Sequence, residues 1–324
     1  MTLDDKTILV TGGTGSFGRK FVQIALSRYE PRRVIVFSRD ELKQHEMSKE
    51  FADPRLRFFL GDVRDRDRLH RAFEASVDIV VHAAALKQVP ACEYNPFEAI
   101  KTNVLGAQNI IEAAIDRGVP KVVAISTDKA VNPINLYGAT KLCAEKLFVQ
   151  GNVYAGPRPT RFSCVRYGNV LGSRGSVVPV FLEQRRTGKV TVTDPRMTRF
   201  WLTLEQGVEF VIHCVELMQG GEIFVPRIPS MKIGDLVEAV APGCEVSFSG
   251  IRPGEKINEV LISEDEARHT VAQEDMFAIF PEMPWWGDRK RIEGKNLPNG
   301  FAFTSDANEQ WLSIGELRRI LEIP

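Results

Sequence analysis

Four side chains in one short stretch of the sequence have the types and spacing needed for acid–base chemistry. Tyr137 and Lys141 stand four residues apart, so both project from one face if Tyr137 opens a helix. An ammonium close to a phenol favours the phenolate, which brings a tyrosine pKa of about 10 towards neutrality and makes the residue a base. Asp128 and Lys129 lie just upstream and are available for a second proton transfer. Taken alone, these residues also fit a lysine-rich helix preceded by a solvated dipeptide, so the interpretation depends on the rest of the chain.

A glycine-rich turn near the start of the chain predicts a dinucleotide-binding site. The β-branched apolar run from Thr7 to Val10 ends at Thr11-Gly-Gly-Thr-Gly-Ser-Phe-Gly18, and apolar residues then recur at helical spacing. A strand, a glycine turn and a helix in this order let the backbone approach a pyrophosphate, which the N–H groups of the helix N-terminus bind. The residues that we expect to contact the cofactor here are Gly12, Thr14, Gly15, Ser16, Phe17 and Gly18.

The residues at the end of the second predicted strand indicate which of the two nicotinamide cofactors, NAD or NADP, is expected. Val34 to Phe37 is followed by Ser38 and Arg39, where an NAD enzyme needs a carboxylate for the ribose 2′-hydroxyl. A cation here suits the 2′-phosphate of NADP, and Lys43 can add to it. Asp40 is placed with this site, although it also fits a helix start, where acids interact favourably with the dipole. We therefore predict NADP rather than NAD, with a solvated surface arginine as the alternative.

Two further predicted strands end in residues that leave room for a nucleotide. The strand from Leu56 to Leu60 precedes Asp62, which can accept from an adenine amine or cap the next helix. The strand from Val77 to Val81 precedes a run of alanines and Lys87, and the carboxyl ends of parallel strands line the ligand crevice of a doubly wound sheet. We therefore add Asp62, Val63, Ala83 and Lys87 to the predicted cofactor site.

A long helix and two more strands complete the expected sheet. Asn95-Pro96 opens a helix that contains Asn103, which we place beside the cofactor, with a position at the helix edge as the alternative. Strands from Val122 to Ile125 and from Phe162 to Tyr167 flank the helix that begins at Tyr137. The alternation of strands and helices predicts an α/β fold with a Rossmann-like, doubly wound parallel sheet.

The regular alternation ends after Gly168, which divides the chain into two predicted domains. Residues 1–168 are expected to form the NADP-binding Rossmann domain. Residues 169–324 are expected to form mainly a smaller, irregular α/β domain for the substrate, with about 195–227 returning to the first domain.

The second half also contains loop residues with possible functions. Arg174, Arg199 and Arg252 fall in predicted loops, where they could hold a second diphosphate or remain solvated. Residues 277–299 are predicted to form a long loop with Trp285-Trp286, whose exposed aromatic surface suits a subunit contact or a lid.

The composition excludes several other classes of function. The 42 basic and 42 acidic residues give zero net charge, so no whole-protein field attracts nucleic acid or a membrane. The five cysteines fall singly, so neither a zinc site nor a disulfide framework is expected, and no other metal is predicted. No stretch approaches the roughly 18 apolar residues of a membrane span, and the first residues lack the features of a signal peptide. We expect a cytoplasmic protein.

Taken together, these motifs resemble the extended short-chain dehydrogenase/reductase superfamily of nucleotide-sugar enzymes. A closer resemblance, up to about Ser263, is to the inverting UDP-N-acetylglucosamine 4,6-dehydratases, which open pseudaminic acid biosynthesis. The stretches that carry it are Ser38-Arg-Asp-Glu-Leu-Lys43, Gly61-Asp-Val-Arg-Asp65, His82-Ala-Ala-Ala-Leu-Lys87, Ser126 to Lys141, Arg166-Tyr-Gly-Asn-Val-Leu-Gly-Ser-Arg-Gly-Ser176, Arg196-Met-Thr-Arg-Phe-Trp201 and Gly250-Ile-Arg-Pro-Gly-Glu-Lys256.

The pair Asp128-Lys129 discriminates within that superfamily. Ordinary sugar C4-epimerases lack the pair, and dTDP-glucose-type dehydratases follow the aspartate with glutamate. Capsule-type dehydratases that also epimerise have methionine where this chain has Tyr137, so the tyrosine favours the pseudaminic branch. Asn258 departs from the histidine expected shortly after Gly-Glu-Lys, and the sequence diverges from about Glu264 onwards.

The resemblance implies a redox-neutral loss of water and a role for each residue. Tyr137, with Lys141 stabilising its phenolate and Thr127 bonding the same oxygen, takes the O4 proton while hydride passes from C4 to NADP. Lys129 then removes the C5 hydrogen and Asp128 protonates the departing C6 hydroxyl. Hydride then returns to C6 and a proton to C5 on the opposite face, which inverts that centre. The product is a UDP-2-acetamido-2,6-dideoxy-L-arabino-hexos-4-ulose, and the tightly bound NADP is regenerated each turnover. The implied substrate contacts are Lys87, Asn169, Arg174, Val177, Met197, Arg199, Arg252 and Glu255.

Both proton-transfer roles need shifted pKa values, since a free lysine is charged and a free aspartate is ionised at pH 7. Burial must therefore overcome the attraction between Asp128 and Lys129, or the two share a proton as a coupled pair. The resemblance also implies a homo-oligomer, either a hexamer or a dimer, that acts on a UDP-sugar. A retaining 4,6-dehydratase or a C4-epimerase is the nearest alternative. An NADPH-sensing regulator without chemistry is a remote one, because Tyr137 and Lys141 are both present.

Overall fold

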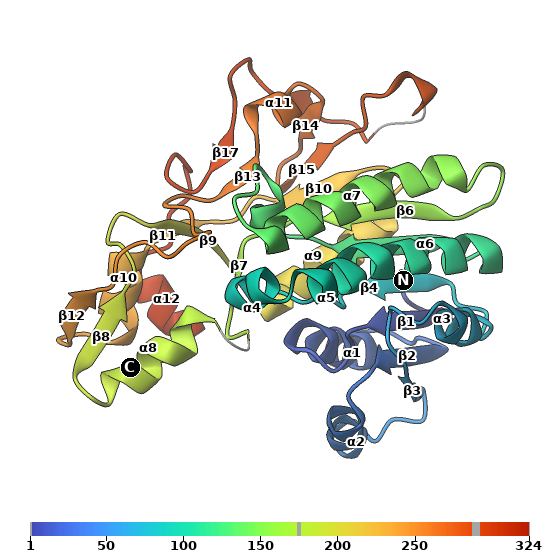
Figure 1. The fold of residues 1–324 in the computed structure, drawn as a ribbon, viewed down its shortest axis with the longest axis horizontal. Coiled ribbons are helices and arrows are strands. Elements are labelled where there is room, and N and C mark those ends of the chain that lie inside the picture. The colour runs from blue at the N-terminus through green and yellow to red at the C-terminus, as the bar shows by residue number, and fades with distance from the viewer. Residues whose placement is uncertain (1, 174–175, 287–291, 324) are drawn as a thin grey trace.

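A ten-stranded β-sheet forms the centre of the computed structural model, which describes residues 2–173, 176–286 and 292–323 (Figure 1). Its parallel strands are, in spatial order, β3 (Leu56–Leu60), β2 (Arg33–Ser38), β1 (Thr7–Thr11), β4 (Ile79–His82), β5 (Lys121–Ile125), β6 (Arg161–Val165) and β10 (Ile223–Pro226). The strand order reverses between β1 and β4, so the sheet is doubly wound. The predicted α/β fold class with a Rossmann-like parallel sheet is confirmed.

Three antiparallel strands extend the sheet beyond β10. They are β15 (Met276–Ile279), β14 (Thr270–Ala272) and β16 (Lys295–Asn296). The prediction of one long loop over residues 277–299 is therefore wrong, because a buried apolar strand within it pairs with β10. Trp286 is only 6% exposed and packs into the main core, so the aromatic surface in this segment comes from Trp285, which is 59% exposed. Residues 287–291 of the predicted loop lie outside the described part of the chain.

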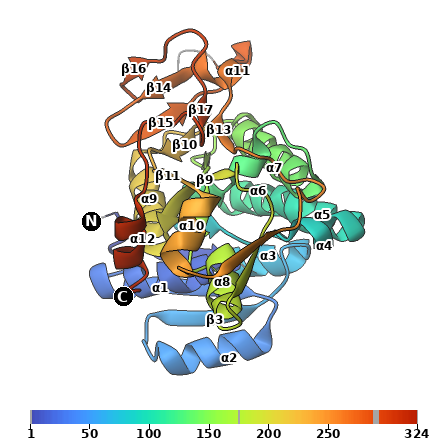
Figure 2. The same ribbon diagram turned by 90° about the vertical axis from the view of Figure 1, so that its left-hand side faces the viewer.

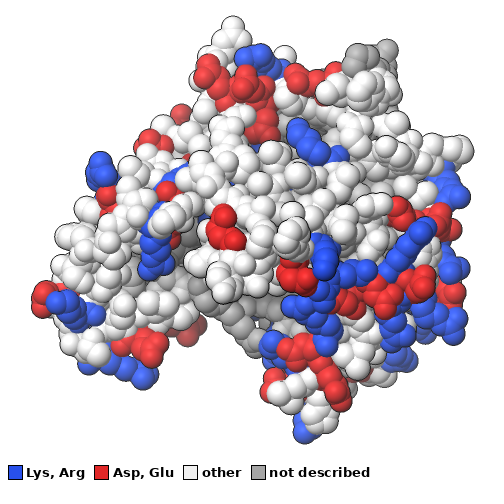
Figure 3. Space-filling view, in the orientation of Figure 1, with Lys and Arg blue, Asp and Glu red and all other residues white. Residues whose placement is uncertain are grey.

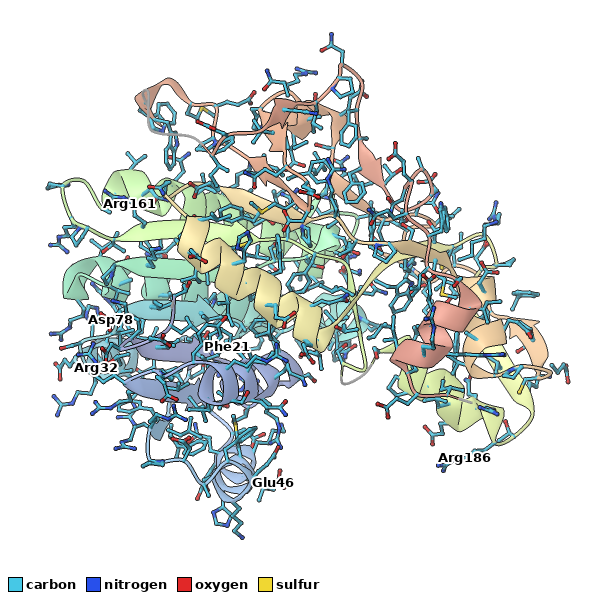
Figure 4. All side chains as sticks on the ribbon, turned by 180° about the vertical axis from the view of Figure 1, so that it is seen from behind. Phe21, Arg32, Glu46, Asp78, Arg161 and Arg186 are labelled. Atoms are coloured by element: carbon cyan, nitrogen blue, oxygen red, sulfur yellow. The ribbon has the colours of Figure 1, made fainter. Side chains whose placement is uncertain are left out.

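Helices cover both faces of the parallel strands. α1 (Ser16–Arg28) and α9 (Leu204–Leu217) pack against each other on one face, which Figure 4 shows from behind. The other face, at the front of Figure 1, carries α3 (Arg66–Phe73), α6 (Gly106–Arg117) and α7 (Leu136–Tyr154). Because both faces are covered, the residues of β1 are buried throughout, as the continuous apolar run predicts. α2 (Glu41–Glu50) contacts β2 and β3.

The helix predicted to start at Asn95 contains an unexpected π-helical turn. α5 (Pro96–Ile100) leads into a π-helical segment at Lys101–Leu105, and α6 follows. The periodicity of apolar residues does not show such a turn, because it widens the helix without changing the residue types. Turns of this kind occur frequently at functional sites. Here it contains Asn103, which is 2% exposed.

A second lobe, seen from its own side in Figure 2, is built from short strands and helices. A three-stranded sheet contains β11 (Ser230–Lys232), β9 (Thr198–Thr203) and β7 (Asn169–Leu171), and β8 (Lys189–Val192) pairs with β12 (Glu245–Phe248). The helices are α8 (Val177–Arg185), α10 (Ile233–Val240) and α12 (Ile314–Ile320). The lobe has a hydrophobic core of its own, which includes Trp201, Leu236 and Leu317. Within the segment 195–227, β9 belongs to this lobe. α9 packs on the central sheet, and β10 is one of its strands.

The remaining elements are short. They are α4 (Val89–Tyr94), α11 (Glu264–Ala267), the 3-10 turns η2 (Asp128–Ala130) and η3 (Pro284–Trp286), and the antiparallel pair β13 (Val260–Ile262) and β17 (Phe303–Thr304). No helix within the described ranges is long and apolar enough to cross a membrane.

Candidate active site

A cleft of about 1060 Å³ lies between the carboxyl ends of the parallel strands and the second lobe. The molecular surface is hollowed between these two parts in Figure 3. All the predicted cofactor, catalytic and substrate residues line this cleft except Asp40, Asn103 and Arg174. Arg174 lies outside the described residues. Residues far apart in the sequence are therefore brought to one surface, as the topology of a doubly wound sheet requires.

The glycine turn after β1 has the shape of a pyrophosphate cradle. Gly12 has a φ of +64°, and a Cβ there would lie 2.9 Å from the backbone of Ala84. A Cβ on Gly18 would lie 2.5 Å from the Cα of Gly13, so the turn and the first helical turn pack too closely for side chains. Gly15 is the N-cap of α1, and Ser16, Phe17 and Gly18 in its first turn line the cleft, where the N–H groups of a helix N-terminus suit an anion. These residues fit a dinucleotide.

The end of the cleft next to β2 carries the predicted cationic residue. Arg39 is 56% exposed at its side chain, and its Nη1 lies 3.6 Å from Oδ2 of Asp62. Asp62 is also paired with Arg64 at 2.7 Å. Burial alone raises the pKa of Asp62, but the hydrogen bonds from Arg64 and the charge of Arg39 leave it below its ordinary value. The hydroxyl of Thr14 bonds that of Ser38 at 2.8 Å and joins the glycine turn to the end of β2.

Asp40 does not line the cleft, contrary to the cofactor prediction. Its carboxylate accepts the backbone N–H of Lys43 at 3.0 Å and pairs with the Lys43 ammonium, so it caps α2. This is the helix-start alternative considered for the residue. Lys43 itself does line the cleft.

Asn103 also lies outside the cleft and holds the loop after β4. Its Oδ1 accepts from the N–H of Leu86 at 2.8 Å, and its Nδ2 donates to the carbonyl of Leu86 at 2.9 Å and to the hydroxyl of Thr140 at 3.0 Å. Its amide is therefore occupied by protein groups rather than pointed at a cofactor. Asn103 therefore links this loop to Thr140 on α7.

The stretch predicted to be catalytic forms a tight turn packed against the start of α7. Thr127 caps η2, and its hydroxyl donates to Oδ1 of Asp128 at 2.8 Å. Asn135 caps α7 by accepting the N–H of Gly138 at 2.7 Å. A Cβ at Gly138 would strike the carbonyl oxygen of Lys129, so this position needs glycine for the turn and the helix to meet.

Tyr137 and Lys141 lie on α7 as predicted, but their electrostatic environment differs from the expectation. Burial raises the pKa of Tyr137 to about 12, while the charge of Lys129 and a hydrogen bond with Thr127 act in the opposite direction. The Nζ of Lys141 donates to the carbonyl of Ile125 at 2.6 Å, and burial lowers the pKa of this ammonium. In the protein alone, the cation that most favours the phenolate is therefore Lys129.

Lys129 contacts two carboxylates, of which sequence reasoning identified one. Its Nζ is 3.0 Å from Oδ1 of Asp128 and 3.4 Å from Oε1 of Glu259. Burial lowers the pKa of Lys129, but the charges of Asp128 and Glu259 outweigh it, so the net shift is upward. Lys129 is thus an ammonium here. The only sequence signal for Glu259 was its place just after the Gly-Glu-Lys motif.

Arg199 and Arg252, both predicted to contact the substrate, differ in burial and in hydrogen-bond partners. Arg199 lies on β9 rather than in a loop, and it is 8% exposed. Its guanidinium donates to the carbonyls of Thr198, Ile257 and Lys256 at 2.7–2.9 Å, so it is largely occupied by backbone acceptors. The loop prediction for this residue is wrong, because its β-branched and aromatic neighbours favour a strand.

Arg252, by contrast with Arg199, is an exposed arginine of the cleft. It lies in the loop before β13 and pairs loosely with Glu255 at 3.8 Å. Lys256, which the predictions left out, lines the cleft and donates to the carbonyl of Val131 at 2.6 Å. Within the described ranges, no group of His, Cys, Asp and Glu residues could hold a metal ion.

The fold and this cleft define a member of the extended short-chain dehydrogenase/reductase superfamily. The polysaccharide biosynthesis protein family matches residues 8–281. The chain is 50% identical to the UDP-N-acetylglucosamine 4,6-dehydratase (inverting) of Campylobacter jejuni subsp. jejuni serotype O:2, over 98% of this chain and 97% of that protein. It is 44% identical to the UDP-glucose 4-epimerase of Rickettsia conorii, over 85% of this chain and 83% of that protein.

Two solved structures have a fold similar to that of this chain. Pen from Bacillus thuringiensis is similar over 100% of both chains, with a TM-score of 0.91 and 38% identity. DesIV, a dTDP-glucose 4,6-dehydratase from Streptomyces venezuelae determined with NAD bound, covers 78% of this chain and 86% of its own, with a TM-score of 0.70 and 25% identity. The chain belongs to the polysaccharide biosynthesis protein family, in the group that contains the inverting UDP-N-acetylglucosamine 4,6-dehydratases.

Proposed function

We propose that this protein is an NADP-dependent lyase that catalyses the inverting 4,6-dehydration of UDP-N-acetylglucosamine. The observation that carries the proposal is the cluster of Asp128, Lys129 and Tyr137 at one point of the cleft. The relatives named as inverting dehydratases share half of their residues with nearly the whole chain, which supports the same substrate. The product would be UDP-2-acetamido-2,6-dideoxy-L-arabino-hexos-4-ulose, and we propose that it enters pseudaminic acid biosynthesis.

Oxidation at C4 needs a base at O4. Tyr137 takes this proton, with Thr127 hydrogen-bonded to the phenol oxygen and with Lys129 and Lys141 lining the same cleft. Because burial holds the pKa of Tyr137 at about 12 in the protein alone, even with the charge of Lys129 beside it, the bound ligands must stabilise the phenolate further. A bound nicotinamide cofactor supplies the hydride acceptor for this step and the hydride that returns to C6.

Loss of water needs a base at C5 and an acid at O6, because the 4-ketone acidifies the C5 hydrogen. Asp128 and Lys129 can supply both through one internal transfer across their 3.0 Å contact. The N–H bond of the ammonium breaks and an O–H bond forms on the carboxylate, which leaves Lys129 as an amine base and Asp128 as a carboxylic acid. Lys129 then takes the C5 hydrogen, and Asp128 gives its proton to the departing hydroxyl. When hydride returns to C6, a proton adds to C5 on the opposite face and inverts that centre.

The choice of NADP rests on the end of β2. Arg39 and Lys43 line the cleft there, and the Arg39 side chain is 56% exposed and loosely paired, so it can turn to a 2′-phosphate. Asp40, the acid next to Arg39, caps α2 and does not line the cleft, which argues against its use for a ribose 2′-hydroxyl. The neighbour DesIV was determined with NAD, so the proposal for this chain depends on its own cations.

A C4-epimerase on the same scaffold is the second candidate, because relatives named UDP-glucose 4-epimerase are 44% identical. Epimerisation at C4 needs an acid–base group at O4 alone. Two additional proton-transfer groups, Asp128 and Lys129, beside the phenol favour chemistry at C5 and C6 as well.

Proton NMR of the purified protein with UDP-N-acetylglucosamine in heavy water tests the function. We expect a 6-deoxy-4-keto sugar with deuterium at C5 and the ring couplings of the inverted centre. Retained configuration at C5 would indicate a retaining dehydratase, and an intact C6 hydroxyl with a changed C4 would indicate an epimerase. Cofactor binding without any sugar turnover would support a sensor protein.

We also propose that the protein is a homo-oligomer, either a dimer or a hexamer. Support comes from the adjacent helices α4 and α5 at the front of Figure 1, where Tyr94 is 87% and Phe97 is 75% exposed. Light scattering on the parent and on a Tyr94→Ser/Phe97→Ser variant tests this, since a monomeric parent would contradict it.

A further inference from the structure

Glu259, which no motif assigned, reaches the proton-transfer pair from the residue just before β13. Its Oε1 lies 3.4 Å from Nζ of Lys129, and the residue is 2% exposed. Its other carboxylate oxygen is buried and has no hydrogen-bond partner among the residues that the structure describes. A buried acid with an unsatisfied oxygen is costly to keep, so its position calls for a functional explanation.

The backbone of Glu259 is fixed independently of its side chain. Its N–H donates to the hydroxyl of Ser305 at 2.9 Å, and its carbonyl accepts the N–H of Ser305 at 2.9 Å. The residue immediately precedes β13, which pairs with β17. The carboxylate is therefore presented to Lys129 by a rigid strand start rather than by a free loop.

Several charged or titratable groups face Lys129 besides Glu259. They are Asp128, Arg199, Lys87, Lys256 and the phenol of Tyr137. Arg199 is 3.8 Å from the same Glu259 oxygen that faces Lys129, so this carboxylate is also held by a second cation. Two acids, Asp128 and Glu259, thus meet one ammonium at the point where dehydration needs a base and an acid.

We propose that Glu259 is a positioning residue of the dehydration, which holds Lys129 against Asp128 and keeps one proton shared between them. The role in turnover rests on the proposed function, whereas the effect on Lys129 does not. In the transfer described above, the proton moves from Lys129 to Asp128 while Glu259 keeps its charge. The amine then retains an N–H directed to Glu259 and turns its lone pair towards substrate. The upward shift of the Lys129 pKa by Asp128 and then Glu259 agrees with this arrangement.

The test compares Glu259→Gln with the parent, with Glu259→Asp as the conservative variant. Glu264→Gln is the matched control, since Glu264 is an exposed acid a few residues away on α11. The first readout is the NMR titration of the Lys129 side chain in protein labelled at lysine, assigned with a Lys129→Met variant. Because Glu259 stabilises the ammonium, Glu259→Gln should move this titration to lower pH by roughly one unit. Glu259→Asp should restore part of the shift, and Glu264→Gln should leave it unchanged.

The second readout is the pH dependence of kcat for dehydration. Asp128 and Lys129 must keep their shared proton for dehydration to occur, so kcat should fall once that proton is lost at high pH. In Glu259→Gln this fall in kcat should occur at lower pH than in the parent. We expect kcat to fall by roughly tenfold or more with KM within about threefold, because Glu259 orients the reacting groups. An unmoved Lys129 titration would overturn the proposal, as would an unmoved alkaline limb accompanied only by a lower melting temperature.

These readouts separate the inference from the proposed function. If the parent forms no 4-keto sugar, the dehydratase proposal fails, and the Lys129 titration in the unliganded protein still decides whether Glu259 sets its ionisation. If the parent turns over and the Glu259→Gln titration matches it, the inference fails and the dehydratase proposal stands. If Glu259→Gln does not fold, the Lys129 titration of Glu259→Asp is compared with that of the parent instead.

Discussion

The guanidinium of Arg166 and the carboxylate of Glu145 form two hydrogen bonds, of 3.0 and 2.7 Å, and both side chains are buried. Arg166 directly follows β6, and Glu145 lies on α7, so the pair fixes this helix to the sheet. Glu266 adds two more bonds to the same guanidinium at 3.0 and 2.9 Å. One arginine therefore joins the sheet, the catalytic helix and the capping box of α11.

Arg166→Met should destabilise the protein strongly, because it leaves the Glu145 carboxylate buried without its cation. Loss of one partner of such a pair costs about 3–5 kcal/mol of unfolding free energy. Chemical denaturation of the parent and the variant measures this difference in unfolding free energy. Arg268→Met is the control, since that arginine is 71% exposed and paired with an exposed acid, and it should cost no more than about 1 kcal/mol. Equal losses in the two variants would contradict the role given to Arg166.

Glu266 should make stability depend on pH in the acid range. Burial raises its pKa, but the charge and hydrogen bonds of Arg166 outweigh this and leave the pKa below the ordinary value. A carboxyl with a lowered folded pKa stabilises the protein above its unfolded pKa of about 4.3, and this contribution is lost as pH falls through the folded value. The melting temperature should therefore fall below about pH 4 in the parent, and Glu266→Gln should reduce that slope. If the melting temperatures of the parent and of Glu266→Gln fell with pH in the same way, Glu266 would not be the source of this pH dependence.

Lys129→Met should separate oxidation from dehydration. The variant keeps Tyr137 and the glycine turn, so it should still reduce bound NADP transiently in the presence of UDP-N-acetylglucosamine, although more slowly because Lys129 helps the phenolate. It should release no 6-deoxy-4-keto sugar, a loss of roughly 100-fold or more, since no base remains at C5. Stopped-flow absorbance and product NMR measure the two steps. Turnover within a few-fold of the parent would remove Lys129 as the base.

The parts of this protein that were predictable from sequence depend on local patterns. β-branched runs and glycine spacing indicate β1 and the turn at Gly12, because a buried parallel strand and a close backbone approach restrict the residue types directly. The spacing of Tyr137 and Lys141 likewise follows from one helical turn. These features were found where the sequence placed them.

The parts that were not predictable depend on distant residues. Glu259 reaches Lys129 only because β13 packs beside η2, and no local pattern of an acid after an asparagine indicates this. Arg199 resembled a solvated loop arginine, but the backbone carbonyls of residues 256 and 257 occupy it. Asn103 was assigned to the cofactor, yet the π-helical turn directs it to Leu86. In each case the deciding partner comes from another element.

Arg39→Ala should weaken NADP binding far more than NAD binding. The guanidinium is the exposed cation at the end of β2, and a charge-assisted contact to a phosphate contributes about 1.5–3 kcal/mol, or roughly 10- to 100-fold in Kd. Isothermal titration of the cofactor-free protein with each dinucleotide measures the difference. Arg57→Ala, on the neighbouring strand β3, is the control and should change neither affinity. Equal losses for NADP and NAD would exclude a 2′-phosphate contact.

Gly138→Ala should damage catalysis without unfolding the catalytic helix. Alanine favours a helix over glycine by about 1 kcal/mol, which offsets part of the strain. Its Cβ, however, would strike the carbonyl oxygen of Lys129 and force η2 away from α7, which moves Asp128 and Lys129 relative to Tyr137.

We expect kcat to fall by roughly 100-fold for an ångström-scale displacement, with the melting temperature changed by only a few degrees. Gly315→Ala is the matched control, because Gly315 lies in helix α12 with open space around its Cβ, and it should leave turnover unchanged. If Gly138→Ala retained the kcat of the parent, the close contact between η2 and α7 would not be what positions the proton-transfer pair.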